Sequence, residues 1–130
     1  MRELARRLMS CPGWRWTGGM RCKDSGWRWR DGYLFAMDGT GDFIETPGGS
    51  VPDLEDPATL GCLLALVREA WGRPALAASP AGAPDGSVSW CVEALDADDG
   101  DGYHALTPRR ATEAEALVDA LEEAPCASSE

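Results

Sequence analysis

The chain has 130 residues, of which 44% are apolar and 26% are charged. This length fits one globular domain, residues 1–130, and is too short for two separate cores; residues 125–130 are expected to fray. The formal charge of −10 disfavours non-specific binding to DNA or to anionic membranes. No apolar stretch reaches the length of a membrane span, and the arginine-containing start does not resemble a signal peptide, so we expect a cytoplasmic protein.

Charge is divided unevenly along the chain. Residues 1–30 hold eight bases and two acids, a net charge of +6, whereas residues 31–130 hold four bases and twenty acids, a net charge of −16. Such asymmetry indicates either two surfaces with different partners or two parts of one molecule that attract each other. We favour attraction within the molecule, with the remaining acids forming a solubilising surface.

The first part of the chain predicts a short helix followed by strands. Residues 2–9 space leucines one turn apart, which predicts an amphipathic helix. Residues 13–20 and 26–33 then repeat the pattern G-W-R-W-x-x-G-apolar. In strands, alternation puts the tryptophans on one face and the arginines on the other. With Asp31-Gly32 as a hairpin turn, the pattern predicts a small antiparallel sheet over residues 14–46.

The most regular pattern predicts a central helix that follows Asp56. This residue can cap the helix, Pro57 suits its first turn and Gly72 can end it. The apolar positions follow the helical period and leave few charges, so the helix must be covered on most sides. They are Leu60, Cys62, Leu63, Leu64, Leu66, Val67 and Trp71. We expect Trp71, which closes this stripe, to be mostly buried.

The remaining chain predicts a loop, two strands and a last helix. Residues 73–86, rich in alanine and proline, are expected to form a connecting loop. Alternation over residues 87–93 predicts a half-buried strand, and an aspartate-rich turn leads to a second strand at 103–106. Thr112 and Glu115 form a capping box that opens the last helix. This helix is expected to turn Leu117, Val118 and Leu121 inward and Asp119, Glu122 and Glu123 outward, and to end at Pro125.

The predicted order is a helix, three or four strands, a helix, a two-stranded hairpin and a helix. Antiparallel strands joined by hairpins, with helices gathered on one face, define an α+β architecture. We therefore predict an antiparallel sheet of about five to six strands packed against about three helices.

The residues that usually carry metal binding or catalysis are few and scattered. Five cysteines contain no C-x-x-C pair and His104 is the only histidine, which predicts free thiols and no metal site. A nucleophilic mechanism would have only His104 as its base, and no phosphate-binding glycine motif occurs. We therefore predict no cofactor and no enzymatic activity. Asp96, Asp98, Asp99 and Asp101 do not match the EF-hand spacing and are interpreted as an acidic hairpin turn.

Two interpretations of the W-R-W segments remain open. Arginines beside exposed tryptophans suit single-stranded nucleic acid, since bases stack on the rings and guanidinium groups hold phosphates. Alternation instead favours tryptophans in the core beneath an arginine surface. The tryptophans concerned are Trp14, Trp16, Trp27 and Trp29, and the candidate binding residues are Arg15, Arg28 and Arg30.

Three segments resemble small bacteriophage and prophage accessory proteins. They are residues 56–72, DPATLGCLLALVREAWG, residues 112–122, TEAEALVDALE, and the opening helix with Trp14-Arg15-Trp16 and Gly19-Met20. The resemblance does not extend to residues 21–50 and 73–106. It implies an origin and an architecture rather than a reaction, because the shared residues are core and cap positions. Small non-catalytic phage proteins of this kind include inhibitors of host defence, such as anti-CRISPR proteins.

The leading hypothesis is therefore a non-enzymatic phage-type protein that binds and inhibits a host defence complex, either a protein or a ribonucleoprotein. Either the acids Asp96, Asp98, Asp99 and Asp101 imitate nucleic acid towards a basic groove, or Arg15, Arg28 and Arg30 meet an acidic partner. The alternative is a nucleic-acid or nucleotide binding module built on the Trp/Arg segments; a third is a phage structural or packaging accessory protein. The net charge disfavours free nucleic acid as a partner, no membrane is expected, and a homodimer is left open.

Overall fold

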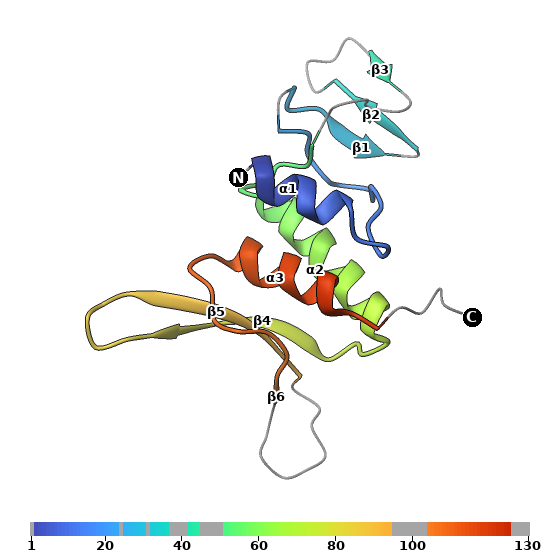
Figure 1. Cartoon of the computed structure of the whole chain (residues 1–130). Helices are drawn as coiled ribbons and strands as arrows, with labels where there is room; N and C mark the ends of the chain where they lie inside the picture. Colours follow the sequence, from blue (N-terminus) through green and yellow to red (C-terminus); the bar gives the residue numbers. More distant parts are fainter. Residues whose placement is uncertain are drawn as a thin grey trace.

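The fold is that of a computed structural model, which describes residues 2–23, 25–30, 32–36, 42–44, 51–94 and 104–125. In chain order its elements are α1 (Arg2–Met9), β1 (Arg28–Arg30), β2 (Tyr33–Phe35), β3 (Phe43–Ile44), α2 (Pro57–Trp71), β4 (Leu76–Gly82), β5 (Val88–Ala94), β6 (His104–Ala105) and α3 (Glu113–Glu123) (Figure 1). No helix within these ranges is long and apolar enough to cross a membrane.

The three helices form the middle of the molecule, with one small sheet at each end (Figure 1). Strands β1, β2 and β3 form the first sheet and β4, β5 and β6 the second, both antiparallel. The α+β architecture is confirmed, whereas the prediction of one sheet of about five to six strands is wrong. The reason is the length of α2, about 22 Å for 15 residues, which places the strands before it and the strands after it at opposite ends.

The first sheet contains the predicted hairpin. Arg30 of β1 lies opposite Tyr33 of β2, and Arg28 lies opposite Phe35. Gly32, in the two-residue turn, has a φ of +90°, a left-handed conformation that glycine adopts without strain. The hairpin is therefore confirmed, whereas much of the predicted sheet beyond it, at 37–41 and 45–46, lies outside the described residues.

The first copy of the G-W-R-W pattern is not a strand. Backbone pairing with β1 begins only at Gly19, whose N–H donates to the carbonyl oxygen of Trp29 at 2.9 Å; the N–H of Trp29 donates to the carbonyl oxygen of Met20 at 2.8 Å. Gly19 has a φ of +104°, which interrupts an extended strand. The prediction of two similar strands is therefore wrong, because this glycine turns the chain before pairing starts.

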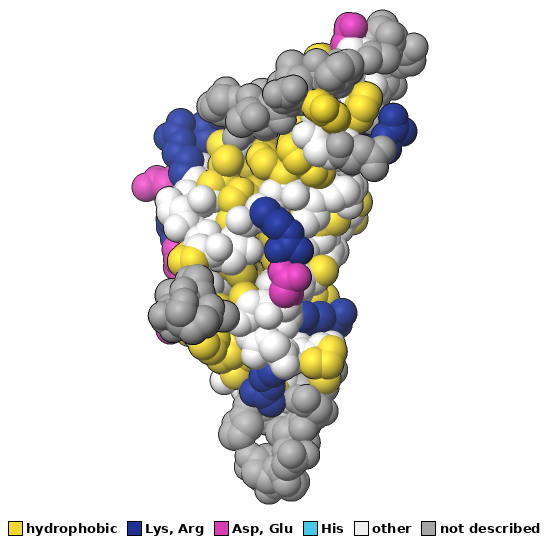
Figure 2. All heavy atoms as spheres, turned by 90° about the vertical axis from the view of Figure 1, so that its right-hand side faces the viewer, with side chains coloured by type: hydrophobic (Ala, Val, Ile, Leu, Met, Phe, Trp, Pro, Cys, Tyr) yellow, Lys and Arg dark blue, Asp and Glu magenta, His cyan; other side chains and the backbone are white. Residues whose placement is uncertain are grey.

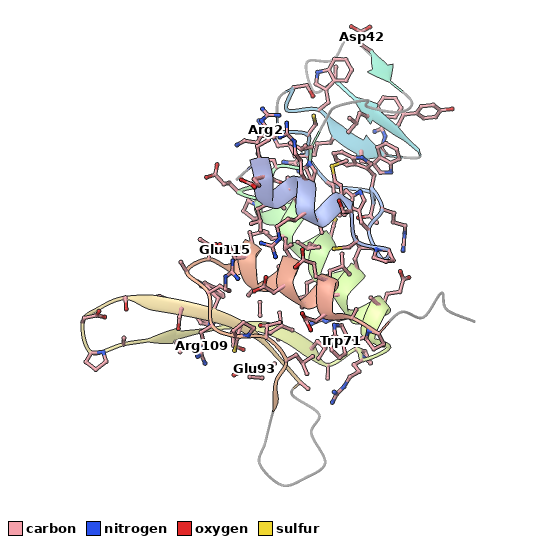
Figure 3. All side chains as sticks on the ribbon, in the orientation of Figure 1. Arg2, Asp42, Trp71, Glu93, Arg109 and Glu115 are labelled. Atoms are coloured by element: carbon pink, nitrogen blue, oxygen red, sulfur yellow. The ribbon has the colours of Figure 1, made fainter. Side chains whose placement is uncertain are left out.

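Helix α2 begins and ends where the sequence predicts. The Asp56 carboxylate accepts the N–H of Thr59 at 3.0 Å, and Gly72 ends the helix with a left-handed φ of +66°. The prediction that Trp71 is mostly buried is confirmed, although part of its surface stays exposed. It lies in the last turn of α2 (Figure 3), where its indole N–H donates to the carbonyl oxygen of Ala120 in α3 at 2.9 Å.

Residues 73–86 do not form the predicted loop. Strand β4 lies within this stretch, and each of its 7 residues pairs with a residue of β5. The two strands are joined by the turn Pro84-Asp85-Gly86, in which the N–H of Gly86 donates to the carbonyl oxygen of Ala83 at 2.9 Å. Gly86 has a φ of +89°. The predicted strand at 87–93 and its antiparallel partner, β6, are confirmed.

Helix α3 begins with the predicted capping box. The Thr112 hydroxyl accepts the N–H of Glu115 at 3.1 Å, and the Glu115 carboxylate accepts the N–H of Thr112 at 3.2 Å. Asp119, expected on the outside, is buried with 7% of its surface exposed. The cause is that the guanidinium groups of Arg7 and Arg110 both reach its carboxylate.

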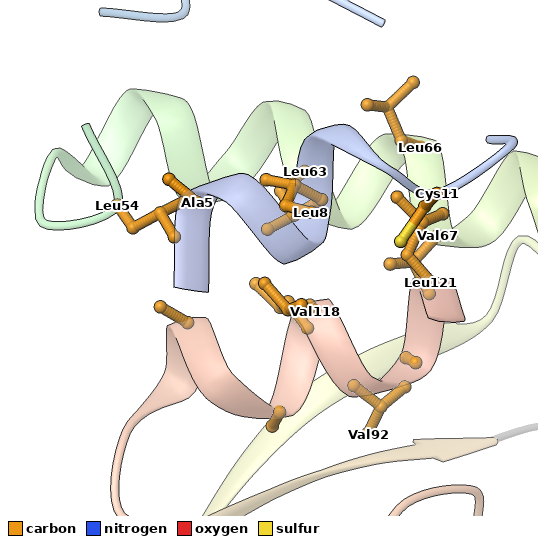
Figure 4. Packing of buried hydrophobic residues seen from close by; sticks show 14 of the residues in the cluster. Ala5, Leu8, Cys11, Leu54, Leu63, Leu66, Val67, Val92, Val118 and Leu121 are labelled. Atoms are coloured by element: carbon orange, nitrogen blue, oxygen red, sulfur yellow. The ribbon is translucent and has the colours of Figure 1, made fainter. Parts of the chain in front are cut away.

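The hydrophobic core lies between the three helices and continues beneath α3 to β5 (Figure 4). Helix α3 is the middle layer, since it packs against α1 and α2 on one side and against β4 and β5 on the other. Residues of the core without exposed surface include Ala5, Leu8, Leu63, Val67, Leu76, Val92, Leu117 and Val118. The predicted inward face of α3 is therefore confirmed for Leu117 and Val118, as it is for Leu121.

Candidate functional site

The basic N-terminal segment is bound to acids from later in the chain. Four ion pairs connect the two: Arg7 with Glu122 at 2.6 Å, Arg15 with Glu69 at 2.5 Å, Arg28 with Asp56 at 2.8 Å, and Arg21 with Asp53. Each pair joins residues that are at least 28 positions apart. The prediction that the two parts of the chain attract each other is therefore confirmed, and these arginines support the fold.

Asp119 is the centre of the most buried group of charges. Arg7 donates to its Oδ1 at 3.1 Å, and Arg110 Nη1 lies 3.1 Å from its Oδ2. Arg7 also binds both carboxylate oxygens of Glu122, at 2.9 and 2.6 Å, and these hydrogen bonds hold the pKa of Glu122 below its ordinary value. The network fixes α1 to α3. Within the described residues, Oδ2 of Asp119 is buried and accepts no hydrogen bond, although it forms an ion pair with Arg110.

Arg28 connects the first sheet to the beginning of α2. Its guanidinium donates to both oxygens of Asp56, at 2.8 and 2.9 Å, and to the carbonyl oxygen of Gly19 at 2.9 Å. Asp56 also accepts the hydroxyl of Thr59 at 2.9 Å. The hydrogen bonds from Arg28, followed by those from Thr59, lower the pKa of Asp56 from 3.8 to about 2. The main role of Arg28 is therefore structural, since it holds the first sheet to the beginning of α2.

The outer face of the first sheet combines arginines with aromatic rings. Residues opposite each other in an antiparallel pair point to the same face, so Arg28, Arg30, Tyr33 and Phe35 share one face. The guanidinium carbon of Arg30 lies 4.5 Å from the centroid of the Phe35 ring. Phe35 meets Tyr33 edge to face, with centroids 6.1 Å apart. We refer to these four residues as the Arg/aromatic face.

Trp29 lies on the other face of this sheet, because it alternates with Arg28 and Arg30 in β1. Trp29 stacks on Trp16 with centroids 5.7 Å apart and an interplanar angle of 22°, and Trp16 meets Trp14 at 5.6 Å. All three are partly buried and pack against the core, and Trp27 is also half-buried. They are neither fully buried nor a free stacking platform.

Hollows on the described surface include a groove and a cleft. A groove of about 280 Å³ borders the Arg/aromatic face and is lined by Gly18, Gly19, Arg28, Trp29, Arg30 and Phe35. A wider cleft of about 470 Å³ lies where α2 and α3 end; the Arg15–Glu69 ion pair and Trp14 contribute to its lining. Figure 2 shows hydrophobic side chains gathered in the upper half of one face, with Lys and Arg side chains to either side.

The predicted binding residues do not form one surface. Arg15 pairs with Glu69 near the end of α2, whereas Arg28 pairs with Asp56 at its beginning. The 13 positions between the two acids correspond to about 20 Å along the helix. Arg30 is exposed and shares the Arg/aromatic face with Arg28. Asp96, Asp98, Asp99 and Asp101 lie outside the described residues.

The cysteines are structural within the described ranges. Cys11, Cys22 and Cys91 are buried, Cys62 is half-buried, and none of the four forms a disulfide. Burial raises the pKa of the Cys11 thiol to about 11, which disfavours the thiolate that metals bind. No group of three or more metal-ligating side chains gathers among the residues that the structure describes.

We expect the purified protein to carry no stoichiometric zinc or calcium, because the cysteines are scattered and the aspartates do not follow an EF-hand spacing. Elemental analysis by inductively coupled plasma mass spectrometry after exhaustive dialysis tests this expectation. One metal atom per chain would contradict it.

Tyr33 and Phe35 are the site residues that the sequence pattern alone does not single out. The signal is nevertheless present, since the Asp31-Gly32 turn fixes the register that places them opposite Arg30 and Arg28. Any activity must be inferred from this local chemistry. Comparison with protein-family models, with curated proteins and with solved structures finds no match to the chain.

Proposed function

We propose that the chain is a non-enzymatic binding protein that engages a basic surface on a protein or ribonucleoprotein complex, and that it thereby inhibits a host defence complex. This proposal rests on where the net negative charge lies in the chain. The described residues hold all 12 bases and 13 of the 22 acids, so they are close to neutral. The remaining nine acids account for nearly all of the net charge of −10.

The internal pairing of the arginines favours a contact surface that this protein forms with its acids rather than with its arginines. Arg15 and Arg28 already bind Glu69 and Asp56, so an acidic partner would have to compete with these internal carboxylates. Four of the nine remaining acids are Asp96, Asp98, Asp99 and Asp101, a run with no base among them. Such a run concentrates four negative charges within six positions of the chain. Concentrated negative charge is attracted to a basic groove, and an acidic protein bound there would exclude nucleic acid. The choice of a defence complex as the target rests on the resemblance of residues 56–72 and 112–122 to phage accessory proteins.

We expect the protein to block binding of labelled target DNA to a purified CRISPR effector complex when it is added in small molar excess. The variant D96N/D98N/D99N should associate with that complex at least about tenfold more slowly at low salt, because loss of steering charge acts mainly on the association rate. Surface plasmon resonance at several salt concentrations separates association from dissociation.

A charge-matched control is available among the residues that the structure describes. The variant E3Q/E55Q/E123Q also removes three exposed carboxylates and should associate with nearly unchanged rates. Equal slowing of both variants would show that net charge alone matters. A panel of defence complexes that ignores the wild-type protein would contradict the proposed inhibition.

Nucleic-acid binding is the competing function, and the same preparation tests it. Labelled single-stranded DNA and RNA should not shift on a gel at physiological salt, because no described track of unpaired arginines follows a strand backbone. A micromolar shift that disappears when Arg15, Arg28 and Arg30 are replaced by alanine would favour the nucleic-acid module instead.

A further inference from the structure

We propose that Trp14, Trp16 and Trp29, together with the cleft that Trp14 lines, bind a proline-rich peptide in the polyproline II conformation. We refer to the three residues as the tryptophan ladder. The inference goes beyond the proposed function, since it concerns a neutral peptide rather than a basic surface. It rests on the order of the rings, on indole donors that lack an acceptor and on the pairing of the charges around the cleft.

The tryptophan ladder connects the cleft with the groove. Trp14 lines the cleft where α2 and α3 end, and Trp29 lines the groove beside β1. Trp16 lies between them, edge to face with Trp14 at 5.6 Å and stacked on Trp29 at 5.7 Å. The centroids of Trp14 and Trp29 are therefore at most about 11 Å apart. A polyproline II helix rises about 3.1 Å per residue, so about four residues cover the ladder.

The ladder carries hydrogen-bond donors that the protein does not use. The indole N–H groups of Trp14 and Trp16 have no acceptor among the described residues, whereas that of Trp71 donates to the carbonyl oxygen of Ala120 at 2.9 Å. The side-chain polar atoms that are both buried and unpaired in the described part include no indole nitrogen, so these two donors keep some exposed surface. A tryptophan with one apolar side and one free N–H is typical of interfaces. A ligand along the ladder therefore needs acceptors.

The side-chain acceptors and charges of the cleft are already engaged. The charged residues in its lining are Arg15, Glu69 and Glu122. Arg15 donates to both oxygens of Glu69, at 2.5 and 3.2 Å, and Arg7 donates to both oxygens of Glu122. A charged ligand, or one rich in N–H and O–H groups, would have to displace a guanidinium group or leave its own donors unpaired. The cleft therefore favours a neutral ligand with few donors.

A proline-rich peptide has this combination of properties. Proline has no backbone N–H, and the carbonyl groups of a polyproline II helix make no internal hydrogen bonds, so they can accept from the indoles. Its rings suit the apolar walls of the cleft, which include Pro12, Ala70, Leu121 and Pro125. The helix is formed before binding, which keeps the entropic cost low. The cleft volume of about 470 Å³ lies within the range of about 300–1,000 Å³ that is usual for ligand sites.

Titration of the ¹⁵N-labelled full chain with decaproline tests the proposal by NMR. The indole N–H signals of Trp14 and Trp16 should shift together and saturate, with a dissociation constant on the order of 1 mM or lower. The indole signal of Trp71, whose N–H is bonded to Ala120, should stay in place and serves as an internal control. A glycine-serine peptide of the same length is flexible and carries N–H donors, so it should bind at least about fivefold more weakly. Added sodium chloride should change the affinity for decaproline less than about twofold, because no ion pair is formed.

Two variants and a matched control make the result specific. Trp14→Phe and Trp16→Phe keep an aromatic ring but lose the donor, and each should weaken decaproline binding about fivefold. Trp90→Phe makes the same change at a half-buried position of β5, in the other sheet, and should bind like the wild type. An unchanged Trp71 indole signal shows that each variant is folded.

Several outcomes would overturn the proposal. They are equal weakening by Trp90→Phe, equal affinity for the glycine-serine peptide, and no saturation at ten times about 1 mM decaproline. Equal affinity for cellohexaose would show that the rings accept a sugar as readily as a peptide. Indole signals of Trp14 and Trp16 that shift when the free protein is diluted would assign the ladder to a second copy of the chain. Either of these results would also overturn it.

Discussion

Replacement of Trp71 with alanine is expected to lower the free energy of unfolding by about 3 kcal/mol. The indole packs against the core at the end of α2, and its N–H donates to the carbonyl oxygen of Ala120 at 2.9 Å. Full burial of a tryptophan predicts a loss of about 3–5 kcal/mol, and the partly exposed surface of Trp71 places the effect at the lower end. Urea denaturation followed by circular dichroism at 222 nm measures the change without relying on tryptophan fluorescence.

Two further variants separate packing from hydrogen bonding at this position. Trp71→Phe keeps most of the apolar contact but loses the donor, and should cost about 1 kcal/mol. Ala65→Ser, at an exposed position of the same helix, should change the stability by less than about 0.5 kcal/mol. An unchanged unfolding midpoint in Trp71→Ala would contradict the role assigned to the contact between α2 and α3.

The helices were predictable because their boundaries are encoded locally. Asp56 and Gly72 enclose α2, and Thr112 with Glu115 opens α3, through hydrogen bonds that span only a few residues. Such caps depend on the chain next to them and not on how distant parts pack. The predicted apolar stripes therefore appear in the core with few corrections.

The strand β4 could not be identified in this way. Its sequence, LAASPAG, is rich in alanine and contains Pro80, both of which disfavour a strand. Pro80 is tolerated because its partner in β5, Trp90, uses its backbone N–H and carbonyl on the other side, towards Arg110 at 2.7 and 2.8 Å. The side of Pro80 that would carry the N–H therefore faces the free edge of the sheet. The lack of a donor there also hinders pairing with another strand. The turn Pro84-Asp85-Gly86 was the available signal for this hairpin.

The candidate site was predictable in part. Alternation placed Arg28 and Arg30 on the face opposite Trp29, but the sequence did not reveal that Arg28 binds the cap of α2. Likewise, the charge asymmetry indicated attraction between the two parts of the chain without naming the pairs. Asp119 shows why: its position on the outward side of α3 becomes buried only when Arg7 of α1 is packed against it. Such pairings depend on tertiary structure, which periodicity does not contain.

Replacement of Asp56 with alanine should lower the free energy of unfolding at pH 7 by about 3 kcal/mol. About 1 kcal/mol is the loss of the helix cap, and about 2 kcal/mol is the loss of the negative charge that Arg28 and Thr59 stabilise. Asp56→Asn keeps a capping oxygen and should lose only the ionic part. Thermal or urea denaturation of the three proteins in parallel measures both contributions.

The same residue predicts how stability depends on pH. The pKa of Asp56 is lowered to about 2 in the folded protein, against an ordinary value of 3.8, so the ionised carboxylate favours folding. Its contribution is complete above pH 3.8 and is lost as the pH falls from there towards 2. The stability difference between the wild type and Asp56→Asn should therefore be constant from pH 7 to about 5 and shrink by about 2 kcal/mol towards pH 2. A difference that stays constant down to pH 2 would show that the carboxylate is not held by Arg28, and that the first sheet is fixed to α2 by other contacts.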